Sequence, residues 1–255
     1  MARESINIGR FTPDSLNKLL MKAASFADTG ERIGFLSERF KGTPYVENTL
    51  IGSDDTNEVF VIDFEGVDCF TFIDYIEAMR LSSSFADFRE CLKKIRYRSG
   101  SISFVNRNHF FNDWREFNGA FVEDVTEKVG LQDTRTIRKV LNQREDGSFI
   151  VPGIGPVERD VRFIASSSLD VQIISRIKTG DYIGIYSDRQ GLDVSHVGIF
   201  IRQANVAFFR HASSIKEVRK VVDQDFVEYV KKKPGIIILR PKEASKSCCV
   251  IPPHT

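Results

Sequence analysis

Cys69 lies at the predicted start of a helix, where a thiol can become reactive. It follows a short apolar run, residues 59–62, and Asp68 is a suitable helix cap directly before it. A helix N-terminus offers unpaired N–H groups and about half a positive charge, so it favours a thiolate and can hold a developing oxyanion. Cys69 is therefore a candidate nucleophile, although a buried structural cysteine would fit the same pattern.

Two histidines on neighbouring predicted strands could act with this thiol. Alternation along residues 194–201 places His196 and Gly198 on one face of their strand, and the glycine leaves room beside the imidazole. His211 ends the next predicted strand, and a turn near residues 203–205 would bring it close to His196. A nucleophile, a base and a group that orients the base make up a catalytic triad. A hydrogen-bonded core histidine is the alternative interpretation of His196.

The elements that must position these residues change in type along the chain. Helical patterns cover a segment that begins at Pro13 and stops by Gly30, and then residues 31–40, 69–79, 85–95, 124–141 and 169–177. Residues 99–121 and 147–161 are expected to be irregular. Strands are predicted at residues 59–62, 181–186, 194–201, 206–209 and 236–239. Helices followed by a mostly antiparallel sheet indicate the α+β class.

Length and composition are those of one globular domain. The chain has 255 residues, of which 42% are hydrophobic and 28% charged, enough to bury a core without disulfides or metals. We expect a single domain over residues 1–242 with an insertion at about residues 96–165, and a flexible tail, residues 243–255, that holds Cys248 and Cys249. The four cysteines form neither a zinc-ribbon pattern nor a disulfide framework. A net charge of +1 provides no basic field for nucleic acid.

The sequence contains no apolar run long enough to span a membrane, which takes about 18 residues. The residues from Met1 to Ser5 lack the apolar stretch of a secretory signal. Two locations are therefore compatible with the sequence: the cytoplasm, or the cell envelope after removal of a signal peptide.

Several motifs in order resemble the NlpC-type cell-wall cysteine hydrolases, which are papain-like enzymes. Asp68-Cys69, the run from Ser195 to Ile199, and His211-Ala212-Ser213 match the family's Cys, His and third polar residue. The resemblance implies a papain-like fold in which Cys69 attacks, His196 is the base and His211 orients it. The loop 42–45 is also similar, and the resemblance implies that the Tyr45 hydroxyl contributes to the oxyanion site.

A narrower resemblance is to the N-acetylmuramoyl-L-alanine amidase-like branch, over roughly residues 11–241. It is carried by residues 42–45, 108–114, 191–198 and 234–236. It implies cleavage of the amide between N-acetylmuramic acid and L-alanine in muropeptides. We expect a monomer without cofactor or metal. Phe70 departs from the small residue that relatives carry after the nucleophile, which puts the shape of the pocket beside the thiol in question. The predicted substrate contacts are His109, Trp114, Asp68 and Ser195.

Other functions fit the same residues. Most NlpC-type relatives cut the γ-D-glutamyl–diamino acid bond, and a secreted effector with this fold could act on proteins instead. A zinc amidase could use His196, His211 and Cys69 as ligands, and a chelator would separate it from a cysteine enzyme. A muropeptide-binding module without activity is the non-enzymatic alternative.

Overall fold

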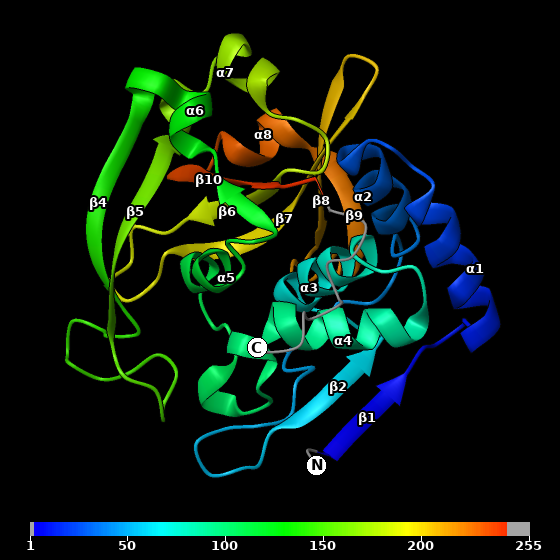
Figure 1. The fold of residues 1–255 in the computed structure, drawn as a ribbon. Helices are drawn as coiled ribbons and strands as arrows, with labels where there is room; N and C mark the ends of the chain where they lie inside the picture. Colours follow the sequence, from blue (N-terminus) through cyan, green and yellow to red (C-terminus); the bar gives the residue numbers. More distant parts are fainter. Residues whose placement is uncertain (1–2, 244–255) are drawn as a thin grey trace, which may run out of the picture.

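The computed structural model describes residues 3–243 and places them around one large antiparallel sheet (Figure 1). In sheet order the strands are β4 (Thr134–Leu141), β5 (Val157–Ala165), β10 (Gly235–Pro241), β6 (Tyr182–Tyr186), β7 (Val194–Gln203), β8 (Val206–Ala212) and β9 (Val221–Asp225), with β3 (Val122–Asp124) also paired to β10. A separate parallel pair is formed by β1 (Arg3–Asn7) and β2 (Val59–Asp63). The mixed α/β class with a mostly antiparallel sheet is confirmed.

Helices cover both faces of this sheet. They are α1 (Pro13–Ala24), α2 (Thr29–Glu38), α3 (Cys69–Arg80), α4 (Phe85–Arg96), α5 (Phe111–Phe117), α6 (Thr126–Gly130), α7 (Val171–Arg176) and α8 (Phe226–Val230). Short 3-10 turns occupy Arg98–Gly100, Phe104–Asn106, Leu131–Asp133 and Ser166–Ser168.

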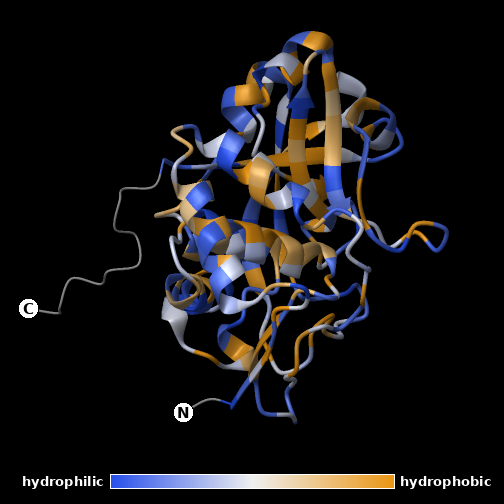
Figure 2. Ribbon diagram, turned by 90° about the vertical axis from the view of Figure 1, so that its right-hand side faces the viewer, coloured by the Kyte–Doolittle hydropathy of each residue, from blue (hydrophilic) through white to orange (hydrophobic). Residues whose placement is uncertain are grey.

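Two hydrophobic clusters correspond to the two faces. Helices α1 to α5 pack on the face that carries Tyr182, Val197 and Ile199, while α6, α7 and α8 pack on the face that carries Ile183 and Phe200. Successive residues of a strand point to opposite faces, so β6 and β7 contribute to both clusters. Figure 2 shows hydrophobic residues along the strands in the middle of the molecule. The centre of the sheet is thus rigidly packed on both sides, which fixes the strands that carry the histidines.

The helix starts were largely predictable from their caps. Thr12 caps α1 and forms a reciprocal capping box with Ser15. Asp68 caps α3 in the same way with Thr71. The predicted helices over residues 31–40, 85–95 and 169–177 correspond to α2, α4 and α7, and the five predicted strands are all present.

Gly30 does not end the first helix, as the sequence suggested. The helix α1 already ends at Ala24, and Gly30 lies in the first turn of α2. A Cβ at Gly30 would lie 2.2 Å from the Thr179 carbonyl oxygen. The glycine is therefore required by close packing between α2 and the chain before β6.

The predicted helix over residues 124–141 is wrong. This segment instead contains the end of β3, the short helix α6 and the strand β4. The run Thr134–Leu141 contains four β-branched residues and pairs along its length with Val157–Ala165. Pairing with a distant strand overrode the local helical pattern. The regions expected to be irregular are likewise more ordered, since α5 lies within 99–121 and β5 starts inside 147–161.

No helix among residues 3–243 is long and apolar enough to cross a membrane. The expected flexible tail with Cys248 and Cys249 lies outside the described residues, apart from residue 243 at its start.

Candidate active site

Cys69 is the first residue of α3, and its side chain lies against the start of β7. Asp68 Oδ1 accepts hydrogen bonds from the N–H groups of Phe70 and Thr71, at 2.9 and 2.7 Å, and so fixes the first turn of the helix. The Val197 backbone N–H of β7 acts on the Cys69 sulfur and favours its thiolate. Val197 directly follows His196 in β7. The thiol is therefore placed beside the strand that carries the predicted base.

The resting thiol of Cys69 is protonated, contrary to what its position at a helix start suggested. Burial, and after it the negative charge of Asp68, raise the pKa of Cys69 to about 12. The backbone N–H groups of Val197, Cys69 and Phe70 act in the opposite direction, but their effect on the pKa is smaller. The capping carboxylate thus outweighs the helix N-terminus, so proton removal must be coupled to attack.

His196 and His211 form a direct hydrogen bond at the splayed ends of β7 and β8. His196 Nε2 lies 2.6 Å from His211 Nδ1, with the two rings perpendicular. The hydrogen-bonded pairing of β7 with β8 begins at Ile199. His196 therefore lies just beyond the paired part of the two strands. The space beside the imidazole that Gly198 leaves is filled by Phe209, whose ring would lie 2.6 Å from a Cβ added there. This aromatic ring holds the histidine pair in place.

Both imidazoles are neutral at physiological pH. Burial, followed by repulsion from His211 and Lys233, lowers the pKa of His196 to about 3. Burial also lowers the pKa of His211 to about 4, with a hydrogen bond to Gln224 acting in the other direction. A neutral imidazole keeps a lone pair and can accept a proton. A protonated thiol at the start of α3 and an unprotonated imidazole on β7 are therefore present on two elements that pack together.

Tyr45 lies beside the same thiol because its loop is pinned at two points. Its backbone N–H donates to the Arg219 carbonyl at 3.0 Å, and the neighbouring Pro44 carbonyl accepts from Val67 N–H at 3.1 Å. Burial, and after it the nearby Cys69, raise the pKa of Tyr45 to about 12. The phenol therefore keeps its proton and remains a hydrogen-bond donor.

The four predicted substrate contacts occupy different environments. His109 Nε2 bonds the Phe104 carbonyl oxygen at 2.8 Å and anchors its own loop. Trp114 is 0% exposed and donates through Nε1 to Asp74 Oδ1 at 2.9 Å, so it packs the core and presents no surface to a ligand. Asp68 is occupied as the cap of α3, while Ser195 is exposed next to His196.

Three further residues at the site carried no signal in the sequence. Gln224 of β9 lies 2.7 Å from His211 Nε2 through its side-chain oxygen. The Tyr229 ring of α8 packs over both imidazoles, with its centroid 5.0 Å from that of His211. The Lys233 ammonium lies 5.1 Å from the Tyr229 ring centroid. Each is brought in by pairing or packing that a local pattern does not reveal.

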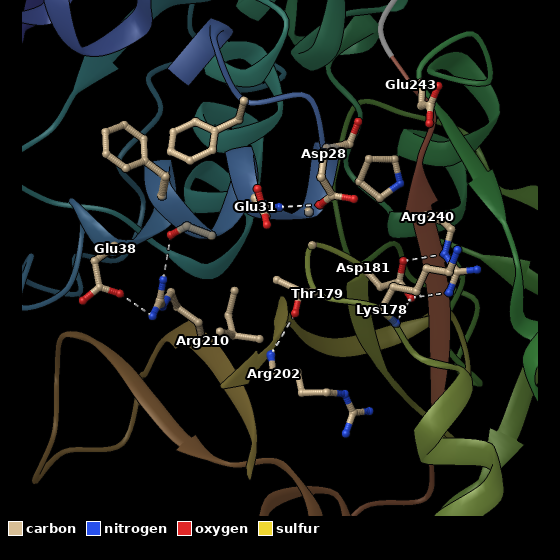
Figure 3. Close-up of a pocket in the computed structure, with 18 of the residues that line it drawn as sticks. Asp28, Glu31, Glu38, Lys178, Thr179, Asp181, Arg202, Arg210, Arg240 and Glu243 are labelled. Carbon is tan, nitrogen blue, oxygen red and sulfur yellow. Dashed lines mark hydrogen bonds and ion pairs between the residues drawn. The ribbon is translucent and has the colours of Figure 1, made fainter. Parts of the chain in front are cut away.

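A large cavity lies elsewhere, beside α2 and the ends of β6, β7 and β10 (Figure 3). It measures about 1220 Å³ and is lined by many charged side chains. Two ion pairs lie among these side chains: Arg240 pairs with Asp181 at 2.7 Å, and Arg210 with Glu38 at 2.7 Å. None of the thiol and histidine residues lines this cavity, so it is not part of the candidate active site.

Within residues 3–243, no three histidine, cysteine or acidic side chains are grouped as metal ligands. The ring nitrogens of His196 and His211 that face each other are bonded together at 2.6 Å, which leaves no space for an ion between them. The donor set therefore fits proton transfer better than it fits zinc.

The fold and site define a mixed α/β protein whose central sheet carries a hydrogen-bonded histidine pair and packs against a helix that starts at a cysteine. The chain belongs to the AmiA-like family of N-acetylmuramoyl-L-alanine amidase-like proteins, whose profile matches residues 35–236. No curated protein matches the sequence.

Two solved structures are similar over nearly the whole chain. An N-acetylmuramoyl-L-alanine amidase from Bacteroides uniformis is 26% identical with a TM-score of 0.67, covering 89% of this chain and 99% of that one. A Legionella pneumophila protein of the DUF1460 family has a TM-score of 0.76 at 24% identity, covering 92% of this chain and 96% of that one. The second likeness concerns the fold alone.

Proposed function

We propose that this protein is a cysteine-dependent amidase that hydrolyses the amide between N-acetylmuramic acid and L-alanine in muropeptides. Membership of the amidase-like family supports the type of bond. The similar Bacteroides uniformis protein, named an N-acetylmuramoyl-L-alanine amidase, supports the same substrate class. The papain-like character of the fold is part of this proposal.

One observation carries the cysteine mechanism. Cys69 is the first residue of α3, its sulfur is acted on by the N–H of Val197, the residue after His196, and His196 is hydrogen-bonded to His211. A nucleophile, a base and an orienting group thus follow one another in space, as acyl transfer requires. A purely structural cysteine has no need of this arrangement.

The first half of the reaction forms an acyl-enzyme. His196 takes the thiol proton on Nδ1, the ring nitrogen that His211 does not occupy, while the Cys69 sulfur bonds to the amide carbonyl carbon. The carbonyl oxygen becomes an oxyanion that accepts hydrogen bonds from the Cys69 N–H and the Tyr45 hydroxyl. The imidazolium then donates its proton to the L-alanine nitrogen, the C–N bond breaks, and the peptide leaves as a free amine.

The second half regenerates the thiol. His196, again neutral, removes a proton from a water molecule that attacks the thioester carbon. The C–S bond breaks, the lactyl carboxylic acid is released, and the proton returns to the Cys69 sulfur. His211 holds the His196 ring through the Nε2–Nδ1 hydrogen bond during both proton transfers.

Defined muropeptides, including 1,6-anhydro forms, and product masses test the proposal. The native protein should release an intact stem peptide with a free L-alanine amine, Cys69→Ala should release none, and a chelator should change neither result. Cys69→Ala should melt close to the native temperature, which shows that the loss is chemical. A cut within the stem would instead indicate a γ-D-glutamyl–diamino acid endopeptidase. Native protein that cleaves no muropeptide would refute the cell-wall function.

A further inference from the structure

The two imidazoles belong to a longer chain of hydrogen bonds that ends on a neutral amide. His196 Nε2 meets His211 Nδ1 at 2.6 Å, and His211 Nε2 meets Gln224 Oε1 at 2.7 Å. The β8–β9 register places Phe209 opposite Gln224 and His211 opposite Val222. Gln224 and His211 therefore share one face of the sheet as diagonal neighbours, so the contact is built into the strand pairing.

The amide oxygen determines where every proton in this chain lies. A side-chain carbonyl can only accept, so His211 Nε2 must carry the hydrogen. A neutral imidazole has a single N–H, which leaves His211 Nδ1 with a lone pair that accepts from His196. His196 Nε2 must then carry the second hydrogen, and its Nδ1 is left unprotonated.

The opposite arrangement would disable the base. If His211 Nε2 had no acceptor, its hydrogen could lie on Nδ1 and point at His196 Nε2. His196 would then carry its own hydrogen on Nδ1 and could not take the thiol proton. An imidazole in the wrong tautomer is a poor catalyst even when its position is unchanged.

We propose that Gln224 is a positioning residue whose side-chain oxygen fixes the tautomers of His211 and His196, so that His196 presents an unprotonated Nδ1 to Cys69. The catalytic part of this statement rests on the proposed function. The tautomers themselves are a property of the folded protein and can be measured without a substrate.

Other charged and titratable groups lie near the histidine pair, but they do not accept a hydrogen bond from His211 Nε2. Lys233 acts on both rings through its charge alone, and Asp223 on His211. Asp223 is already bonded to Arg210 at 2.7 Å. The Tyr229 ring is tilted against the His211 ring at 59°. Burial, and after it the nearby Cys69, raise the pKa of Tyr229 to about 12. Among the described residues, Gln224 is the acceptor that touches His211 Nε2.

Nitrogen-15 NMR of labelled histidine near neutral pH reads the tautomers directly. In the native protein His196 and His211 should both be protonated at Nε2. Gln224→Met keeps the size of the side chain but removes the acceptor, so the two rings should show mixed tautomers. Gln172→Met changes an exposed glutamine of α7 and should leave the spectrum as in the native protein.

Kinetics on the muropeptide test the consequence. Gln224→Met should lower kcat about 10- to 100-fold, within the share that general acid–base catalysis supplies, with KM unchanged. Gln224→Glu retains an acceptor, so it should preserve the tautomers and most of kcat while moving the acid limb of the pH profile to higher pH.

A Gln224→Met protein that folds with native tautomers would overturn the proposal, whatever its activity. Mixed tautomers with an unchanged kcat would overturn the catalytic half. If the native protein cleaves no muropeptide, the proposed function fails, while the NMR comparison still decides whether Gln224 sets the tautomers.

Discussion

Two buried polar networks meet at helix α3, and they differ in charge. Inside the helix, Asp74 Oδ2 accepts from Arg96 Nε at 3.0 Å while its other oxygen accepts from the Trp114 indole. One turn further on, Glu77 pairs with Arg80 at 2.6 Å and accepts from the Tyr182 hydroxyl at 2.7 Å. At the start of the same helix, the thiol and the two imidazoles are neutral.

The difference follows from what each network must do. Removing one residue of a buried ion pair leaves a buried charge without a partner, which strongly destabilises the protein. Full charges therefore hold the elements that carry them in one arrangement. A chain of neutral donors and acceptors costs less to bury and lets a proton change position along it. The charged networks thus fix α3 and α4 against the sheet, while the neutral chain remains able to transfer protons.

The largest effect on activity should come from the neutral chain. His196→Ala removes the base and should lower kcat about 10²–10⁴-fold, whereas His211→Ala removes only the orienting group and should cost less. Neither loss should greatly lower the melting temperature, because no buried charge is left without a partner. Steady-state kinetics and thermal melts of both variants check this. A larger kinetic loss in His211→Ala than in His196→Ala would reverse the assigned roles.

The largest effect on stability should come from the charged network. Asp74→Ala leaves the Arg96 guanidinium buried and unpaired, which should cost about 3–5 kcal/mol of unfolding free energy. Denaturant unfolding measures it.

Asp14→Ala is the matched control, because Asp14 pairs with Lys18 on the exposed surface of α1 and such pairs contribute little. The contrast between the two networks would be wrong if Asp74→Ala and Asp14→Ala were equally stable.

The acid limb of the pH profile is the next test of neutrality. Activity requires unprotonated His196, whose pKa is lowered to about 3, so kcat/KM should change little between about pH 7 and pH 5. An ordinary histidine, with a pKa of about 6.5, would lose roughly 25-fold over that interval. A loss of that size would show that His196 is exposed to water and that burial does not keep its imidazole neutral.

The lowered pKa values of His196 and His211 also make the folded protein sensitive to acid. Because His196 and His211 have lower pKa values folded than unfolded, their contribution to stability is present above about pH 6.5 and is lost as pH falls toward 4 and 3. The melting temperature should therefore decline over that range.

The sequence predicted the parts of the site that depend on local chemistry. The cap Asp68, the helix start at Cys69 and the strand that carries His196 follow from residue types at short spacing, and the structure has all three in place. Their catalytic roles remain predictions. The expectation that the helix start acidifies Cys69 was wrong, because burial and the charge of the cap Asp68 raise the pKa of the thiol.

What the sequence could not predict depends on distant pairing. Gln224 reaches His211 only because β9 pairs with β8, and the segment 134–141 became a strand only because β5 lies beside it. Trp114 looked like a ligand-binding aromatic, yet its indole is enclosed by Asp74 and Tyr182. In each case the partner lies on another element of the fold, so the local periodicity of the sequence does not reveal the contact.

The smallest expected effect concerns Lys233, the cation nearest to the neutral chain. Its charge lowers the pKa of both His196 and His211, so Lys233→Met should raise both values and move the acid limb of kcat/KM to higher pH. Burial is the larger cause of the lowered pKa values, so the acid limb should remain at a lower pH than an ordinary histidine would give. Lys232→Met, an exposed neighbour, is the matched control. If both variants shift the limb equally, net charge rather than the position of Lys233 tunes the base.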